Sequence, residues 1–162
     1  MDKCVFCLAT KGDRSALLDW FGHYKNKSYL VKRLDCYLSQ YNFTSLAKID
    51  GQIVGVLQGL FKEDPAMGLV EFEEVKILDT AQRKGIGSKL LSFSVDVVKK
   101  RFKKMNIPSR KIFLFVNEKN VGAQKFYEKN GFVLESEVGF LFSDKRKELL
   151  YSLDLRQKSH VK

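Results

Sequence analysis

A short turn rich in glycine and basic residues, Gln82-Arg83-Lys84-Gly85-Ile86-Gly87, most constrains what this chain of 162 residues can fold into. It follows a β-rich segment, Leu69 to Leu78, and opens a segment with apolar residues at helical spacing, about Lys84 to Lys104. Glycines let the backbone approach a ligand closely, and the first turn of a helix presents unpaired N–H groups at the positive end of its dipole. Because Arg83 and Lys84 add charge at the same place, the turn predicts a phosphate-binding site.

Two common phosphate-binding motifs do not fit this turn. A Walker loop needs Gly-Lys-Ser or Gly-Lys-Thr after four intervening residues, and the chain lacks that pattern. The dinucleotide-binding fingerprint needs a third glycine three places after the second, where this chain has Leu90. The turn therefore belongs to another class of phosphate site.

The remaining segments predict strands and helices in mixed order around this turn. Asp50-Gly51 lies between two β-rich runs and predicts a hairpin. The expected strands are Val5 to Ala9, Thr44 to Ile49, Gln52 to Leu60, Leu69 to Leu78, Lys111 to Val116, Phe132 to Phe142 and Glu148 to Leu155, and the expected helices are Ser15 to Phe21, Tyr29 to Leu38, Lys84 to Lys104 and Asn120 to Lys129. Helices connect the strands between about residues 78 and 132, so parallel pairing is expected there within a mixed α/β sheet.

The strand before the turn contains a change of phase. Val70 and Phe72 place apolar side chains on even positions, whereas Val75 and Ile77 place them on odd positions. One extra residue in a strand produces such a change, so the pattern predicts a β-bulge at Glu73-Glu74. A plain polar stretch is the alternative interpretation.

Composition indicates one globular domain. Hydrophobic residues make up 44% of the chain and charged residues 30%, and there is no linker-like stretch. We expect a single domain over residues 1–162, with a frayed tail from Arg156 to Lys162. No apolar run approaches the ~18 residues that a membrane span requires, and the first residues do not resemble a signal peptide, so the expected location is cytoplasmic and away from membranes.

The three cysteines, Cys4, Cys7 and Cys36, do not form an even set for disulfide pairing. Cys4-x-x-Cys7 could be half of a metal site, with Cys36 and His23 as the other ligands. Apolar neighbours favour small buried thiols in a first strand instead. We expect no metal.

The formal net charge of +10 favours anionic partners without choosing among them. The densest basic run, Lys99 to Lys104, is typical of a solvated helix face near a C-terminus, where cations also suit the helix dipole. Contact with nucleic acid is the less favoured interpretation.

Two blocks of the sequence resemble the GNAT superfamily of N-acetyltransferases. The first is Val75-Lys76-Ile77-Leu78-Asp79 followed by Gln82 to Leu91, which looks like the acyl-CoA motif of that family. The second consists of Phe115-Val116-Asn117, Asn120, Ala123, Phe126-Tyr127-Glu128-Lys129 and Gly131-Phe132. The resemblance covers about Glu71 to Leu134. It implies a GNAT fold, with a central mixed sheet of about seven strands splayed in a V and about four flanking helices.

The resemblance also implies acetyl-CoA as the acyl donor. Arg83 to Ser88 would bind its pyrophosphate, and the backbone of Ile77 to Asp79 would pair with pantetheine as an added strand does. The Ile77 or Leu78 amide is then the expected oxyanion donor. The full set of expected cofactor-binding residues is Ile77, Leu78, Asp79, Gln82, Arg83, Lys84, Gly85, Ile86, Gly87, Ser88, Asn117, Asn120, Ala123 and Phe126.

Catalytic roles follow from the chemistry of acetyl transfer to an amine. Tyr127 matches the family's general acid, which returns a proton to the leaving thiolate, although it could simply pack the helix on the sheet. The amine must lose a proton, and Glu73 and Glu71, ahead of Glu74, are the candidate bases. A solvated polar edge is the alternative for these carboxylates. Asn117 and Asn120 could instead cap the turn before the helix.

The sequence thus predicts an N-acetyltransferase that acts on a primary amine by direct attack in a ternary complex, as a monomer or homodimer. The alternative is a non-catalytic module that senses acyl-CoA or binds RNA. The acceptor amine is not identified. Four aromatic residues of the early helices could line the acceptor pocket: Trp20, Phe21, Tyr24 and Tyr29. Packing in the hydrophobic core is the favoured interpretation for them.

Overall fold

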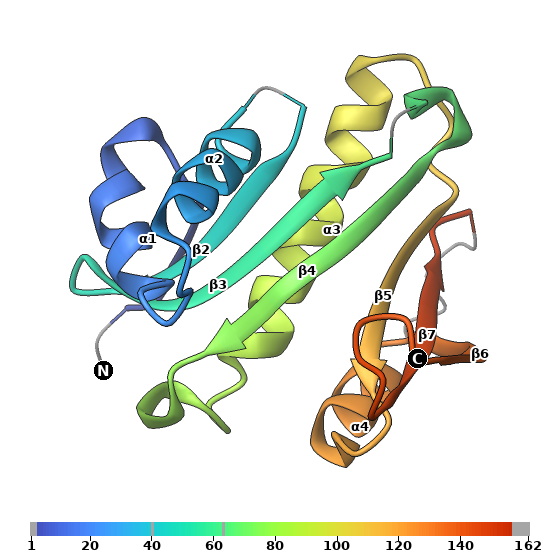
Figure 1. Cartoon of the computed structure of the whole chain (residues 1–162). Coiled ribbons are helices and arrows are strands. Elements are labelled where there is room, and N and C mark those ends of the chain that lie inside the picture. The colour runs from blue at the N-terminus through green and yellow to red at the C-terminus, as the bar shows by residue number, and fades with distance from the viewer. Residues whose placement is uncertain (1–2, 40, 63, 157–162) are drawn as a thin grey trace. The chain divides into compact units, whose positions relative to one another are not determined.

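The structure, a computed structural model, describes residues 3–39, 41–62 and 64–156. In these ranges the elements run β1 Val5–Leu8, η1 Lys11–Asp13, α1 Arg14–Trp20, α2 Lys27–Tyr37, β2 Phe43–Ile49, β3 Gln52–Phe61, η2 Pro65–Met67, β4 Leu69–Ile77, η3 Asp79–Ala81, α3 Ile86–Lys104, β5 Lys111–Asn117, α4 Val121–Lys129, β6 Val133–Gly139 and β7 Lys147–Asp154 (Figure 1). The strands form one mixed sheet in the order β1-β2-β3-β4-β5-β7-β6. The expected seven-stranded mixed sheet with four α-helices is therefore confirmed for the described residues.

The chain divides into two compact units. The first consists of the residues up to Phe61 together with Glu73–Asp96, and the second consists of Lys62–Phe72 together with the residues from Val97 onward. The boundaries fall inside β4 and inside α3, so each of these two elements contributes residues to both units. The expected single domain over 1–162 stays a prediction.

In the first unit, the β2–β3 hairpin has a helix layer on each face. Leu46 and Val56, on the two strands of the hairpin, pack in one core cluster with Leu17 of α1 and Leu34 of α2. On the opposite face, Gly55 of β3 leaves room for side chains of Ile77, Ala47 and Leu90, the last from the first turns of α3. The hairpin turn is the one expected, because Asp50 and Gly51 both have positive φ angles.

The bulge expected in β4 is confirmed. The Leu78 amide donates to the Val54 carbonyl, and the Lys62 amide donates to the Leu69 carbonyl. Thus β4 advances nine residues, from Leu69 to Leu78, while β3 advances eight, from Val54 to Lys62. The extra residue belongs to β4, and Glu74, with a φ of 48°, has the left-handed backbone that marks its place.

In the second unit, β4 pairs in parallel with β5 at Leu69, Val70 and Glu71. β5 then pairs antiparallel with β7, and β7 with β6. Ile112, Leu114 and Val116 on one face of β5 are buried, whereas Phe113 and Phe115 on the other face are half-buried. α4 ends at Lys129, as expected, and the Asn-Gly stop that follows it consists of Asn130 and of Gly131 with a φ of 86°.

Several expected boundaries are corrected. α3 begins at Ile86 rather than Lys84, because Arg83 and Gly85 have left-handed backbones that cannot continue a helix. Phe61 belongs to β3 and not to the following loop. α3 ends at Lys104, as expected, and Met105 beyond it is exposed. Arg156, the start of the expected frayed tail, bonds to Asp154, and residues 157–162 lie outside the described ranges. No helix within the described ranges is long and apolar enough to cross a membrane.

Candidate functional site

The glycine turn places a group of backbone amides at the start of α3. The first intrahelical hydrogen bond runs from the Lys89 amide to the Gly85 carbonyl, 3.1 Å, so the amides of Ile86, Gly87 and Ser88 precede the helical ladder. Gly85 has a φ of 76° and is exposed. Left-handed residues in a turn aim successive N–H groups at one point, which suits an anion. The backbone of the turn therefore fits an anionic group.

The polar side chains of this turn differ in what they bind. Gln82 donates from its amide to the Ile77 carbonyl, 3.1 Å, and to the Asp79 carboxylate, 2.8 Å. Lys84 donates to the Thr80 carbonyl, 2.9 Å. Among the described residues none pairs with Arg83, which is exposed. Gln82 and Lys84 thus brace the turn, whereas Arg83 is the cation left open to a ligand.

The two candidate oxyanion amides point in opposite directions. The Leu78 amide is engaged with the Val54 carbonyl of β3, 2.9 Å. Since N–H groups alternate in direction along a strand, the Ile77 amide points away from β3. The Gln82 bond to the Ile77 carbonyl, on that same side, agrees with this direction. Ile77 rather than Leu78 therefore offers an amide with no partner among the residues that the structure describes.

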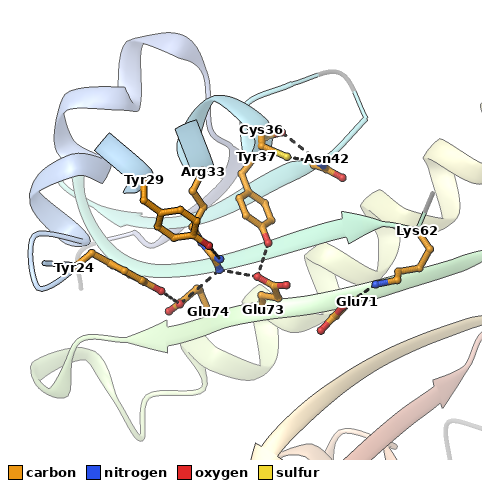
Figure 2. Close-up of polar contacts among 10 residues, drawn as sticks. All are labelled: Tyr24, Tyr29, Arg33, Cys36, Tyr37, Asn42, Lys62, Glu71, Glu73 and Glu74. Carbon is orange, nitrogen blue, oxygen red and sulfur yellow. Dashed lines mark hydrogen bonds and ion pairs between the residues drawn. The ribbon is translucent and has the colours of Figure 1, made fainter. Parts of the chain in front are cut away.

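Two consecutive carboxylates of β4 converge on one arginine of α2 (Figure 2). Arg33 Nη2 lies 2.6 Å from Glu73 Oε2 and 3.7 Å from Glu74 Oε1. Tyr37 donates to Glu73, 2.5 Å, and Tyr24 donates to Glu74. In a regular strand, neighbouring side chains point to opposite faces, so the bulge is what allows both carboxylates to reach Arg33.

The electrostatics of this cluster keep its two phenols neutral. Burial and the hydrogen bond to Glu74 raise the pKa of Tyr24 to about 12. Burial and the bond to Glu73 also raise the pKa of Tyr37. Burial disfavours the charge of Arg33, but its bond to the Tyr29 hydroxyl and the nearby charge of Glu73 hold the Arg33 pKa above its ordinary value. Two carboxylates against one guanidinium leave a net negative charge.

Sequence reasoning missed the α2 side of this cluster. Tyr29, Arg33 and Tyr37 recur every four residues and so form one stripe of the helix, next to the leucine stripe that packs in the core. That spacing was the available signal. The core is the wrong place for Tyr29, which is 50% exposed, and Tyr24 is half-buried in the cluster, whereas Phe21 is buried as expected.

Glu71 has different surroundings, in the second unit. Its carboxylate accepts from Lys62 Nζ, 3.0 Å. The same ammonium lies 5.4 Å from the centre of the Phe113 ring. Within the described ranges, Glu71 therefore pairs with one lysine and shares no partner with Glu73.

Tyr127 lies on α4 in the second unit and is 7% exposed. Phe126 and Phe132 contact its ring edge to face, with centroids 5.2 Å and 5.5 Å away. No described residue forms a hydrogen bond with its hydroxyl, and burial raises its pKa, which keeps the phenol protonated. The packing interpretation of Tyr127 therefore holds for its ring, and its hydroxyl stays free to act.

Both asparagines act locally, as their alternative interpretation expected. The Asn120 side chain accepts from the Ala123 amide, 3.0 Å, and caps α4. Asn117 accepts from the Lys119 amide, 2.9 Å, in the preceding turn. A cofactor contact from either residue, or from Ala123 or Phe126, stays a prediction.

The structure brings part of the expected site together. Glu73, Glu74 and the turn from Ile77 to Ser88 belong to the first unit. Glu71, Tyr127 and the residues from Asn117 to Phe126 belong to the second. Of the candidate bases, Glu73 and Glu74 therefore share a unit with the glycine turn, and Glu71 does not.

Of the three cysteines, Cys36 lies on α2 beside Tyr37 of the cluster (Figure 2). Cys4 and Cys7 are half-buried and free, and Cys36 is exposed. Within the described ranges no group of three or more His, Cys, Asp or Glu could hold a metal ion. In the basic run, Lys100, Lys103 and Lys104 are exposed in the last turns of α3, as a solvated helix face requires.

Comparison with protein families gives one match over most of the chain. The model of the acetyltransferase (GNAT) family matches residues 14–132. This range includes the α2 stripe, the β4 carboxylates, the glycine turn and α4.

Solved structures with the same fold include proteins with different acceptors. A Salmonella typhimurium protein solved with its cofactor acetyl-CoA has a TM-score of 0.76 at 15% identity, over 97% of this chain and 96% of that one. A spermidine/spermine N-acetyltransferase from Vibrio cholerae has a TM-score of 0.71 at 18% identity, over 94% and 92%. A ribosomal-protein-alanine N-acetyltransferase from Brucella melitensis has a TM-score of 0.75 at 17% identity, over 93% and 99%. At these identities the likeness is one of fold.

Proposed function

The chain belongs to the acetyltransferase (GNAT) family, and from this premise we propose that it moves the acetyl group of acetyl-CoA to a primary amine by direct attack in a ternary complex. The observation that carries the proposal is that one unit contains both a helix start suited to an anion and two strand carboxylates, Glu73 and Glu74, that Arg33 holds in place. The unpaired amides of Ile86 to Ser88 suit the pyrophosphate of the donor, and Arg83 adds an open cation.

Glu73 is the proposed base. A protonated alkyl amine has a pKa of ~10, so it must lose a proton before it can attack. The net negative charge of Glu73 and Glu74 against Arg33 attracts the ammonium form, and a carboxylate there can accept the proton. Glu71 is the weaker candidate because it forms a neutral one-to-one pair with Lys62, whereas Glu73 and Glu74 share one guanidinium.

The Ile77 amide and the Tyr127 hydroxyl are proposed for the other two steps. As the amine nitrogen bonds to the thioester carbonyl carbon, negative charge grows on the carbonyl oxygen, and the Ile77 N–H can stabilise it. The carbon–sulfur bond then breaks, and Tyr127 gives its proton to the sulfur of CoA. The phenol regains a proton from solvent.

The experiment is a screen for amine-dependent release of the CoA thiol. Spermidine/spermine and ribosomal-protein-alanine acetyltransferases share this fold, so the panel contains polyamines, amino acids, simple alkyl amines and peptides with free N-termini. We expect one class of amine to be acetylated, with one molecule of CoA released for each molecule of acetylated product. We expect Tyr127→Phe to lower the turnover with that amine.

Binding is measured beside turnover. Acetyl-CoA should raise the melting temperature, because a ligand that binds only the folded state stabilises it. A melting shift without product from any amine would support a non-catalytic acyl-CoA sensor. The absence of a shift at millimolar acetyl-CoA would contradict both accounts.

A further inference from the structure

Arg33 contacts two carboxylates of β4, and the two contacts differ in kind. Its Nη2 lies 2.6 Å from Glu73 Oε2, which is a hydrogen bond, and 3.7 Å from Glu74 Oε1, which is beyond hydrogen-bond distance. Arg33 and Glu73 therefore form a neutral pair. Glu74 is the carboxylate in excess, since its other partner among the described residues is the neutral hydroxyl of Tyr24.

Each carboxylate turns one oxygen toward Arg33 and leaves the other open (Figure 2). Arg33 and the Tyr37 hydroxyl both bind Oε2 of Glu73, and Tyr24 donates to the same Glu74 oxygen, Oε1, that Arg33 approaches. Glu73 Oε1 has no partner among the described residues. Within the proposed reaction, Glu73 Oε1 is therefore the atom that accepts the proton of the amine.

Proton transfer to Glu73 removes the charge that balances the guanidinium. A protonated Glu73 is neutral, and the Arg33 side chain is only 19% exposed. Leaving one charge of a buried pair without its partner is strongly destabilising. A base that was the sole counter-ion of Arg33 would therefore resist protonation. Glu74 removes this obstacle, because it keeps a negative charge beside the same guanidinium.

We propose that Glu74 is a positioning residue for acetyl transfer, the carboxylate with which Arg33 pairs while Glu73 carries the proton. This inference rests on the proposed function. A movement of roughly 1 Å would bring Arg33 Nη2 within hydrogen-bond distance of Glu74 Oε1. The guanidinium lies 5.9 Å and 5.2 Å from the ring centres of Tyr24 and Tyr37, which favours its place between them in either pairing.

Protons and charges balance through this exchange. As the amine nitrogen bonds to the thioester carbonyl carbon, it gives one proton to Glu73 Oε1. The hydrogen bond of Arg33 then passes from Glu73 to Glu74, so that the cation again belongs to a neutral pair. Glu73 later returns its proton to solvent, and Arg33 returns to Glu73. Glu74 neither gains nor loses a proton.

Melting temperatures test the exchange without any acetyl transfer. Glu73→Gln imitates the protonated carboxyl group, and in this variant Arg33 keeps Glu74 as its counter-ion. Glu74→Gln leaves Arg33 paired with Glu73. The double variant removes both of these carboxylates, so it should melt roughly 3–6 °C below the temperature obtained by adding the two single changes.

Asp35→Asn is the matched control. Asp35 also lies on α2, two residues after Arg33, but it pairs with Arg14 at 3.0 Å. Combined with Glu73→Gln, it should change the melting temperature by the sum of the two single changes, and it should leave turnover unchanged. Additive melting changes for Glu73→Gln and Glu74→Gln would overturn the proposal.

Turnover distinguishes this role from that of the base. With the best acceptor of the amine panel, Glu74→Gln should lower turnover at saturating substrates by about 10-fold, with the KM for acetyl-CoA unchanged. Wild-type turnover in Glu74→Gln, or a larger loss than in Glu73→Gln, would overturn the proposal. A wild-type chain that acetylates no amine would overturn the proposed function, whereas additive melting changes in an active chain would overturn the role of Glu74 alone.

Discussion

Arg33 is the residue whose removal should disturb the carboxylate cluster most. Its guanidinium is the cation shared by Glu73 and Glu74, and all three side chains are mostly buried. Arg33→Leu should lower the free energy of unfolding by about 1–3 kcal/mol, the range for hydrogen bonds to charged groups. Urea unfolding of the wild type and of Arg33→Leu at low salt measures this loss of unfolding free energy.

The exposed neighbour Lys32, which has no ion pair among the described residues, supplies the control. Lys32→Leu should change the free energy of unfolding by less than about 0.5 kcal/mol. Equal stability of the two variants would mean that Arg33 contributes nothing to the fold through these carboxylates.

Tyr24 makes stability depend on alkaline pH. Its pKa is raised to about 12 in the folded chain, against ~10 for a free phenol. A group with a raised folded pKa contributes stability that is complete below its unfolded pKa and is lost as pH rises through the folded value. The free energy of unfolding should therefore fall between pH ~10 and about 12, and it should fall less in Tyr24→Phe. If the free energy of unfolding fell equally with pH in the wild type and in Tyr24→Phe, Tyr24 would not be the group responsible.

The turn before α3 depends on one glycine backbone. Gly85 has a φ of 76°, and an added Cβ would meet no atom within 4 Å. Gly85→Ala should therefore cost about 1–2 kcal/mol through backbone strain alone, and it should weaken acetyl-CoA binding, measured by calorimetry. Gly139 is equally open but has no positive φ, so Gly139→Ala is the control. Full acetyl-CoA affinity in Gly85→Ala would separate this turn from the donor site.

Elements with a strong local pattern could be predicted from the sequence. The Asp50-Gly51 hairpin, the phase slip at Glu73-Glu74 and the Asn-Gly stop of α4 each depend on a few adjacent residues. The start of α3 could not be placed to the residue, because glycine composition does not reveal that Arg83 is also left-handed.

The carboxylate cluster is harder to predict because it joins distant segments. Arg33 and Glu73 are forty residues apart, and only the packing of α2 over β4 brings them together. The Tyr29-Arg33-Tyr37 spacing marks a stripe without saying what it faces.

At the scale of the whole chain, two units share two continuous elements. β4 and α3 each cross the boundary between the units, so unfolding of one unit would break a strand and a helix of the other. We expect one cooperative transition, with the calorimetric enthalpy equal to the van't Hoff enthalpy. Two resolved transitions would contradict the expected single domain.

Acetyl transfer by Glu73→Gln tests the account most directly. The substituted amide keeps the shape of the carboxylate but cannot accept a proton, so turnover at saturating acetyl-CoA and amine should fall by about 100-fold or more, with the KM for acetyl-CoA unchanged. Glu71→Gln, measured in parallel, should have a smaller effect, because Glu71 forms a neutral one-to-one pair with Lys62, whereas Glu73 and Glu74 share one guanidinium. Wild-type turnover in Glu73→Gln would contradict the account, since the amine would then lose its proton elsewhere.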